Sequence, residues 1–265
     1  MRKYAVLVVV MCACTTLGPM PATTGISAVP IGRPGLEAQL GTVPTFYLSD
    51  SARADAKGTA TPQLAALLEL DRFIHLPGLV FGGRMFGPNG DTLVEPYVGY
   101  RAKIAEDFAV GGGVFGTAKR SEARLASYHG TRIGGELQLD AKLWEPASWF
   151  ALHGQAALSA TRIEASGTYC VNDMGIAIDC DVEDTTLNTM ISGQQEGVYP
   201  AATGTAVFDF GRDSTRRFRG VRLAALAAAG TMPLVRDGEK TATGMYTTFG
   251  LTLTLTLALA DGDPQ

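Results

Sequence analysis

The sequence has no excess of basic residues and few charged residues of either sign. Its 265 residues include 22 Lys and Arg against 26 Asp and Glu, and charged residues make up 18% of the chain. Ordinary soluble domains carry roughly 25%, and a nucleic-acid-binding surface needs a strong basic excess. The composition therefore excludes a nucleic acid as the expected partner and is unusual for a surface that faces water on all sides.

Long apolar runs, cysteine and histidine are also scarce. Beyond the N-terminal region, no segment reaches the ~18 consecutive apolar residues of a membrane-spanning helix. The chain has four cysteines and three histidines. The acidic segment 179–185 offers oxygen ligands for Ca²⁺, but its spacing matches no EF-hand loop, and a solvated loop is the favoured interpretation. We therefore expect no metal and no cofactor.

The first residues have the pattern of an export signal. Arg2 and Lys3 precede a short apolar run that ends in the stretch VMCAC. A basic start followed by such a run directs export. The stretch resembles a bacterial lipobox, which implies lipid attachment at Cys14, whereas the alternative is a plain signal peptide cleaved near residues 26–28. In both cases the mature chain leaves the cytoplasm.

Two further cysteines, Cys170 and Cys180, lie close together in a polar stretch. Nearby cysteines in an exported protein are expected to form a disulfide. The bond would close an exposed loop within residues 166–197, where an extracellular ligand could bind.

Alternation of apolar with small or polar side chains dominates the rest of the chain. In the segment 249–259, Phe or Leu occupies every second position, and segments 94–104, 132–144 and 149–161 alternate in the same way. Because successive side chains of a strand point to opposite faces, each segment predicts a β-strand with one apolar face. Ten strands are predicted, with eight as the fallback: 35–48, 62–74, 79–87, 93–104, 108–118, 131–144, 149–165, 198–212, 217–231 and 242–260.

The links between these segments alternate in length. Short links at 105–107, 145–148 and 213–216 alternate with longer ones at 119–130, 166–197 and 232–240. Short turns at one rim and long loops at the other are typical of transmembrane β-barrels. We predict an all-β fold, a single closed antiparallel up-and-down transmembrane β-barrel, whose last strand pairs with the first because hydrocarbon offers no partner to an open edge.

The apolar faces could instead pack inside a soluble barrel that binds an apolar ligand. Many of their positions are Gly, Ala or Val, which are too small to fill a wide interior, and a water-facing outer surface would carry more Lys and Glu. Aromatic residues also gather near the short turns, as at a membrane boundary: Phe108, Trp144, Trp149, Phe150 and Phe218. These features favour apolar faces in contact with lipid.

With these features the chain resembles the small outer-membrane β-barrel proteins of Gram-negative bacteria. The resemblance implies location in the bacterial outer membrane and contact with its lipid. The chain departs from the family at its C-terminal end, LALADGDPQ, where such barrels often finish on an aromatic residue. The predicted organisation is an export signal at 1–25, a tether at 26–34, the barrel at 35–260 and a tail at 261–265.

Charged side chains on the opposite strand faces are predicted to form a polar network in the lumen: Glu95, Arg101, Lys103, Glu136, Asp140, Lys142, His153 and Arg222. A turn that paired Trp144 with Trp149 would place Asp140 directly opposite His153. Such a pair could serve as a catalytic dyad, but Ser159 is too far along the strand to be its nucleophile, and a structural ion pair is favoured.

The leading functional hypothesis is a structural or surface-interaction role without catalytic chemistry. About eight strands enclose only side chains, and about 16–18 enclose an aqueous pore, so ten charge-filled strands should conduct poorly. The alternatives are a narrow channel for small or apolar solutes, and a membrane-embedded hydrolase or lipid-modifying enzyme that uses His153.

Overall fold

The structure is a computed structural model, which describes residues 35–47, 59–69, 78–86, 93–122, 127–172, 177–178, 188–211, 218–234 and 242–258. Its strands are β1 (Gly35–Tyr47), β2 (Thr59–Glu69), β3 (Leu79–Phe86), β4 (Leu93–Ala105), β5 (Phe108–Glu122), β6 (Ser127–Ala147), β7 (Phe150–Asn172), β8 (Ala177–Ile178), β9 (Asn188–Phe210), β10 (Phe218–Leu234) and β11 (Ala242–Ala258). Among the described residues, no helix is long and apolar enough to cross a membrane.

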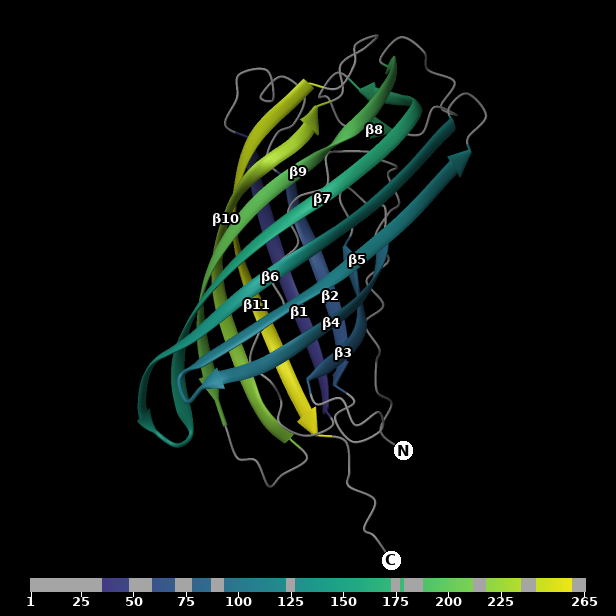
Figure 1. Cartoon of the computed structure of the whole chain (residues 1–265). Coiled ribbons are helices and arrows are strands. Elements are labelled where there is room, and N and C mark those ends of the chain that lie inside the picture. The colour runs from purple at the N-terminus through teal and green to yellow at the C-terminus, as the bar shows by residue number, and fades with distance from the viewer. Residues whose placement is uncertain are drawn as a thin grey trace, which may run out of the picture.

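The ten long strands form one closed antiparallel barrel, to which the two-residue strand β8 is an addition (Figure 1). Consecutive long strands are hydrogen-bonded neighbours. Strand β1 also pairs with β11, from Gly35 opposite Ala258 to Tyr47 opposite Tyr246. This closure satisfies the backbone groups that lipid cannot. The predicted fold class, the count of ten strands and the pairing of the last strand with the first are confirmed.

The strands place charged and hydroxyl side chains inward and apolar side chains outward. In β4, Glu95 is fully buried, whereas Val98, on the opposite face, is exposed. In β11, Thr252 is 5% exposed and the adjacent Leu251 is 67% exposed. The Phe and Leu side chains that alternate in residues 249–257 therefore point away from the barrel interior, as a lipid-facing row should.

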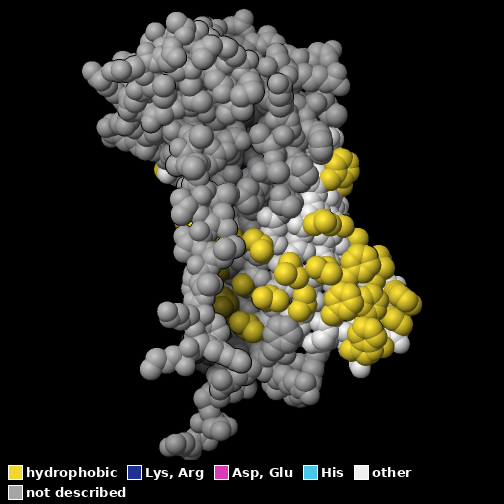
Figure 2. Space-filling view, turned by 180° about the vertical axis from the view of Figure 1, so that it is seen from behind, with side chains coloured by type: hydrophobic (Ala, Val, Ile, Leu, Met, Phe, Trp, Pro, Cys, Tyr) yellow, Lys and Arg dark blue, Asp and Glu magenta, His cyan; other side chains and the backbone are white. Residues whose placement is uncertain are grey.

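The apolar exterior has a clear limit on β7. The outward side chains from Phe150 to Ala160 are apolar or glycine, and the next outward positions are Arg162 and Glu164, both exposed. This stretch matches the roughly 9–11 residues that a tilted strand needs to cross a bilayer. In Figure 2, the described part of one side of the barrel is yellow and white, without the colours of charged residues.

Aromatic rings mark the other end of the apolar exterior, where the short turns lie. The rings of Trp144, Trp149 and Phe210 pack around Phe150, with centroid distances of 5.9, 5.8 and 5.2 Å. Both tryptophans are more than half exposed. Exposed rings at this level are typical of the boundary between hydrocarbon and headgroups.

Strands β5, β6, β7 and β9 continue into the segments predicted as long loops. Strand β5 pairs with β6 up to Glu122 opposite Ser127, and β7 pairs with β9 up to Asn172 opposite Asn188. The loop prediction was therefore wrong for the described parts of 119–130 and 166–197. Both faces of a strand outside the membrane contact water, so these residues lack the apolar alternation by which strands are recognised.

Prolines mark the places where this extended sheet leaves its neighbours. Strand β4 pairs with β5 only from Tyr97 onward, and β9 pairs with β10 only as far as Ala201 opposite Gly230. Pro96 and Pro200 come next in β4 and β9 and have no N–H to donate to a ladder. Beyond these points β5, β6, β7 and β9 form a four-stranded sheet, which we call the rim sheet; these strands rise at the upper right of Figure 1.

Candidate functional site in the barrel interior

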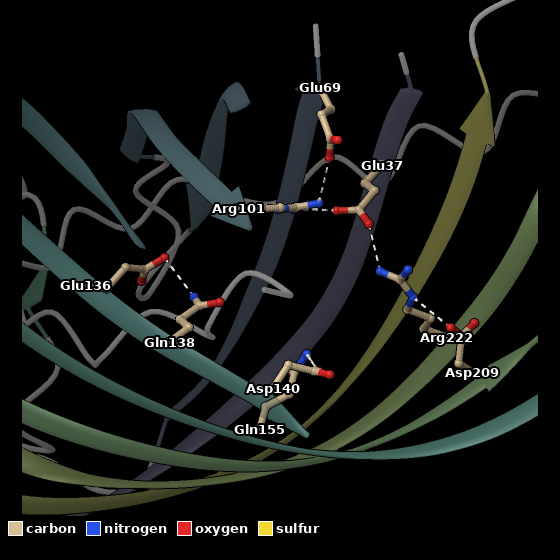
Figure 3. Close-up of polar contacts among 9 residues, drawn as sticks. All are labelled: Glu37, Glu69, Arg101, Glu136, Gln138, Asp140, Gln155, Asp209 and Arg222. Carbon is tan, nitrogen blue, oxygen red and sulfur yellow. Dashed lines mark hydrogen bonds and ion pairs between the residues drawn. The ribbon is translucent and has the colours of Figure 1, made fainter. Parts of the chain in front are cut away.

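A chain of ion pairs crosses the barrel interior near the short-turn end. Glu37 of β1 accepts hydrogen bonds from Arg101 of β4 and Arg222 of β10, each with a length of 2.7 Å. Arg101 also lies 3.7 Å from a carboxylate oxygen of Glu69, and Arg222 lies 3.5 Å from one of Asp209. Figure 3 shows these side chains in sequence from β2 to β9, with Glu37 between the two arginines. We call these five residues the lumen chain.

Strand geometry and barrel closure bring the lumen chain together. Each member lies on the inward face of a different strand, and their exposed fractions range from 1% to 8%. The pairing of β1 and β10 on either side of β11 places Glu37 within reach of Arg222. Since water cannot compensate these charges, removal of one partner from such a buried pair costs about 3–5 kcal/mol.

A second group of ion pairs joins β3, β4 and β6 on the other side of the interior. Arg84 lies 3.2 Å from Glu95 and 3.3 Å from Glu136, and Arg132 lies 3.5 Å from Glu95. The Arg84 guanidinium also stands 4.7 Å from the centre of the Phe115 ring. Planar guanidinium groups suit such sites because they can pair with carboxylates and stack on rings at the same time.

Asp140 and His153 form a third buried contact. His153 Nδ1 lies 2.8 Å from Asp140 Oδ1, and Gln155 Nε2 donates to Asp140 Oδ2 at 2.7 Å. The predicted register was wrong, because Asp140 pairs with Gln155 and His153 with Lys142. Two register shifts in β6 beside the turn move the strands relative to the predicted Trp144–Trp149 pairing. Asp140 and His153 therefore meet diagonally on the same inward face.

Most of the predicted lumen network is buried on the inward face: Glu95, Arg101, Glu136, Asp140, His153 and Arg222. Lys103 and Lys142 are not buried. Lys103 is exposed, and Lys142 Nζ lies 2.8 Å from both Asp107 and Glu145 at the short-turn rim. Both lysines stand near strand ends, where a flexible side chain can reach water, so they do not belong to the buried part of the predicted lumen network.

The prediction omitted several residues that complete the buried ion pairs: Glu37, Glu69, Arg84, Arg132 and Asp209. The same alternation that identified Glu95 could have found them, since each stands at an inward position of its strand. Glu37 and Glu69 lie in the first two strands, where the alternation is weakest.

Ion pairs and hydrogen bonds among buried side chains therefore line the described interior. Beside Glu37 and Arg222 lies a cavity of about 20 Å³, which holds about one water molecule. Within the described ranges, no group of three or more His, Cys, Asp or Glu residues could hold a metal ion. The arrangement is suited to closing the lumen, and the Asp140–His153 pair is its one constellation of catalytic type in the described residues.

Three predicted features lie outside the described residues. These are the lipid attachment at Cys14, the acidic segment 179–185, and the disulfide, since neither the side chain of Cys170 nor any part of Cys180 is described. Lipid attachment and the disulfide therefore stay predictions.

No protein-family model and no curated protein match the chain. Among solved structures, it is similar to Ail, the attachment invasion locus protein of Yersinia pestis, in complex with the heparin analogue sucrose octasulfate, with 10% identity, a TM-score of 0.33 and coverage of 84% of this chain and 97% of Ail. It is also similar to Neisserial surface protein A, with 8% identity, a TM-score of 0.34 and coverage of 85% of this chain and 97% of that protein. A third similar structure is the translocator domain of the autotransporter NalP from Neisseria meningitidis, with 7% identity, a TM-score of 0.37 and coverage of 86% of this chain and 89% of that domain. At this level of similarity, function has to be inferred from the chain's own residues.

Proposed function

We propose that this chain, a small outer-membrane β-barrel protein, has a structural and surface-interaction role without catalytic chemistry. The observation that carries the proposal is the lumen chain, whose buried charges span the interior from Glu69 to Asp209. An apolar exterior holds the barrel in lipid, and the long-loop end, where the rim sheet lies, faces outward in barrels of this kind.

Conductance measurements in planar bilayers test this role. The wild-type protein is expected to give no sizeable current steps, because the lumen chain and the groups around Arg84 and His153 occupy the interior. A Glu37→Ala variant serves as a comparison, since it removes the carboxylate that joins the two arginines of the lumen chain. Large, ion-selective steps from the wild-type protein would contradict the proposal and favour the narrow channel.

Charge predicts how such a channel would behave. The buried residues in the described part of the chain include six carboxylic acids, Glu37, Glu69, Glu95, Glu136, Asp140 and Asp209, against four arginines, Arg84, Arg101, Arg132 and Arg222. An acidic lining favours cations over anions. Any current through the described interior is therefore expected to be cation-selective.

A membrane-embedded hydrolase is the second candidate, and the Asp140–His153 contact of 2.8 Å favours it. His153 Nε2 has no hydrogen-bond partner among the described residues, so this nitrogen could accept a proton from a nucleophile. Against this candidate, His153 is only 5% exposed, which leaves a substrate little access to it. Loss of an ester- or lipid-hydrolysing activity in a folded His153→Ala variant would establish it.

A further inference from the structure

The upper part of β9 has a strand partner on one side only. Its pairing with β7 continues without a register shift from Phe150–Phe210 to Asn172–Asn188. Its pairing with β10 ends at Ala201 opposite Gly230, while β10 continues beside β11 to Leu234 opposite Ala242. Strands β9 and β10 therefore separate, and residues 188–200 form an edge of the rim sheet without a strand partner in the described residues. We call this segment the β9 edge.

The backbone groups that point along this edge can be identified. Thr231 Oγ1 of β10 donates to the carbonyl oxygen of Pro200, at 3.5 Å, so this carbonyl faces β10. In antiparallel strands the N–H and C=O groups of alternate residues point to the same side. Gln194, Glu196 and Val198 therefore direct their backbone groups to the β9 edge, whereas Gln195 and Gly197 pair with β7.

The two edges of the rim sheet differ in how well they are protected. Proteins commonly place charges or proline on sheet edges to prevent pairing with other chains. The β5 edge, residues 116–122, carries Lys119, Arg120 and Glu122 in a short stretch. The longer β9 edge, NTMISGQQEGVYP, contains only one charged residue, Glu196, and its only proline is at the end. The β5 edge therefore carries charges that disfavour pairing with another chain, whereas the β9 edge carries few.

We infer that the β9 edge binds an extended peptide segment of an extracellular partner, which adds to the rim sheet as a further antiparallel strand. Main-chain hydrogen bonds supply affinity in this mode of recognition, and side-chain positions supply specificity. The position beside β9 lies above the point where β10 diverges, so a single strand can occupy it.

The charged residues beside the β9 edge indicate one side chain of the bound peptide segment. Glu196 stands opposite Glu164 on the outward face, and Arg162 contacts both carboxylates. These three exposed residues carry one net negative charge, and opposite charges stabilise directly opposed cross-strand positions. The bound segment should therefore place a Lys or Arg next to Glu196.

This inference rests on the surface-interaction part of the proposed function and is tested separately from conductance. Hydrogen exchange of the protein in lipid nanodiscs, which expose both rims, measures directly which backbone amides of the β9 edge lack a hydrogen-bond partner. Amides of Gln194, Glu196 and Val198 should exchange much faster than those of Gln195 and Gly197. Equal protection of both sets in the free protein would show that the edge is already paired and would overturn the inference.

Binding is tested with a fluorescent decapeptide, TVTVKVTVTV, and its control TVTVEVTVTV. We expect the Lys peptide to bind wild type and Gln194→Ala alike, and to protect the fast amides. Gln194→Pro should weaken binding about tenfold, because it removes one backbone donor from the edge and keeps the pairing with β7. Glu196→Lys should reverse the preference between the two peptides, whereas Glu164→Lys, away from the edge, should only reduce it.

Absence of binding by both peptides, or binding that Gln194→Pro leaves unchanged, would overturn the inference. Folding of each variant is checked by the difference in gel mobility before and after boiling. If Gln194→Pro does not fold, the exchange pattern of the wild-type amides with and without peptide decides the question. Current steps from the wild-type barrel would contradict the structural role, but they would not alter either result.

Discussion

The guanidinium of Arg222 lies 2.7 Å from the carboxylate of Glu37, although 185 positions separate the two residues in the chain. Arg101 binds the other oxygen of the same carboxylate at the same distance. Glu37 and Arg222 lie on strands on either side of β11, so the contact forms only when the barrel is closed. The Glu37 carboxylate therefore links barrel closure to the neutralisation of two buried arginines.

Replacement of Glu37 by alanine should lower the free energy of unfolding by about 3–5 kcal/mol, because it leaves two buried guanidinium groups without their shared partner. Urea titration followed by gel mobility measures the change. The matched control is Glu164→Ala, which removes an exposed carboxylate and should change stability by less than about 1 kcal/mol. Equal effects of the two substitutions would contradict a structural role of the lumen chain.

Arginine at position 156 should destabilise the membrane-inserted barrel more than arginine at position 160. Ala156 is outward near the middle of the apolar stretch of β7, and Ala160 is next to Arg162 at its limit. A charged side chain on the lipid face costs about 2–4 kcal/mol at the midplane and about 0–1 kcal/mol near an interface. Unfolding of the two variants in lipid vesicles measures the difference, and an equal or reversed order would contradict the assigned apolar limits.

Alanine at position 113 should destabilise the barrel by about 1–3 kcal/mol, because overpacking forces the neighbouring side chain to move. A Cβ atom at Gly113 would lie 2.4 Å from atoms of the Tyr97 ring. Gly135→Ala is the control, since its Cβ would meet its nearest atom at 3.5 Å. Chemical denaturation should show a loss for the first variant and a change within about 1 kcal/mol for the second. A neutral Gly113→Ala would mean that the Tyr97 ring lies elsewhere.

Tryptophan fluorescence should report the short-turn boundary alone, since Trp144 and Trp149 are the only tryptophans of the chain. Both are exposed beside Phe150. Lipids brominated near the headgroup end of the acyl chain should quench this emission more than lipids brominated near the bilayer centre. Stronger quenching by the deeper bromines would contradict the placement of these two tryptophans at the membrane boundary.

Alternation predicted the barrel because the membrane imposes it. Residues 249–257 alternate cleanly since one face meets lipid and the other meets a polar interior, and the structure places Leu251 and Thr252 accordingly. Outside the membrane this contrast disappears, which is why the strand extensions at 166–172 and 188–197 were predicted as loop. Length and composition could not separate a polar hairpin from an irregular loop there.

Contacts between distant strands were harder to predict than strand faces. The inward direction of Asp140 and His153 follows from alternation, but their relative register depends on two irregularities beside the β6–β7 turn. Glu37 and Arg222 meet because β1 and β10 lie on either side of β11 in the closed barrel. The alternation within a single strand does not predict which residues face each other across a lumen. The face on which a side chain lies was therefore predictable, whereas the residue that it contacts was not.

Contacts between lipid and methyl groups test the central claim, the orientation of the strand faces. The protein is deuterated except for Leu and Thr methyl groups and placed in nanodiscs of protonated lipid. Nuclear Overhauser effects from acyl chains are expected at the methyl groups of Leu251, Leu255 and Leu257, and not at those of Thr252 and Thr256. Acyl-chain contacts at the threonines, with none at the leucines, would contradict the account.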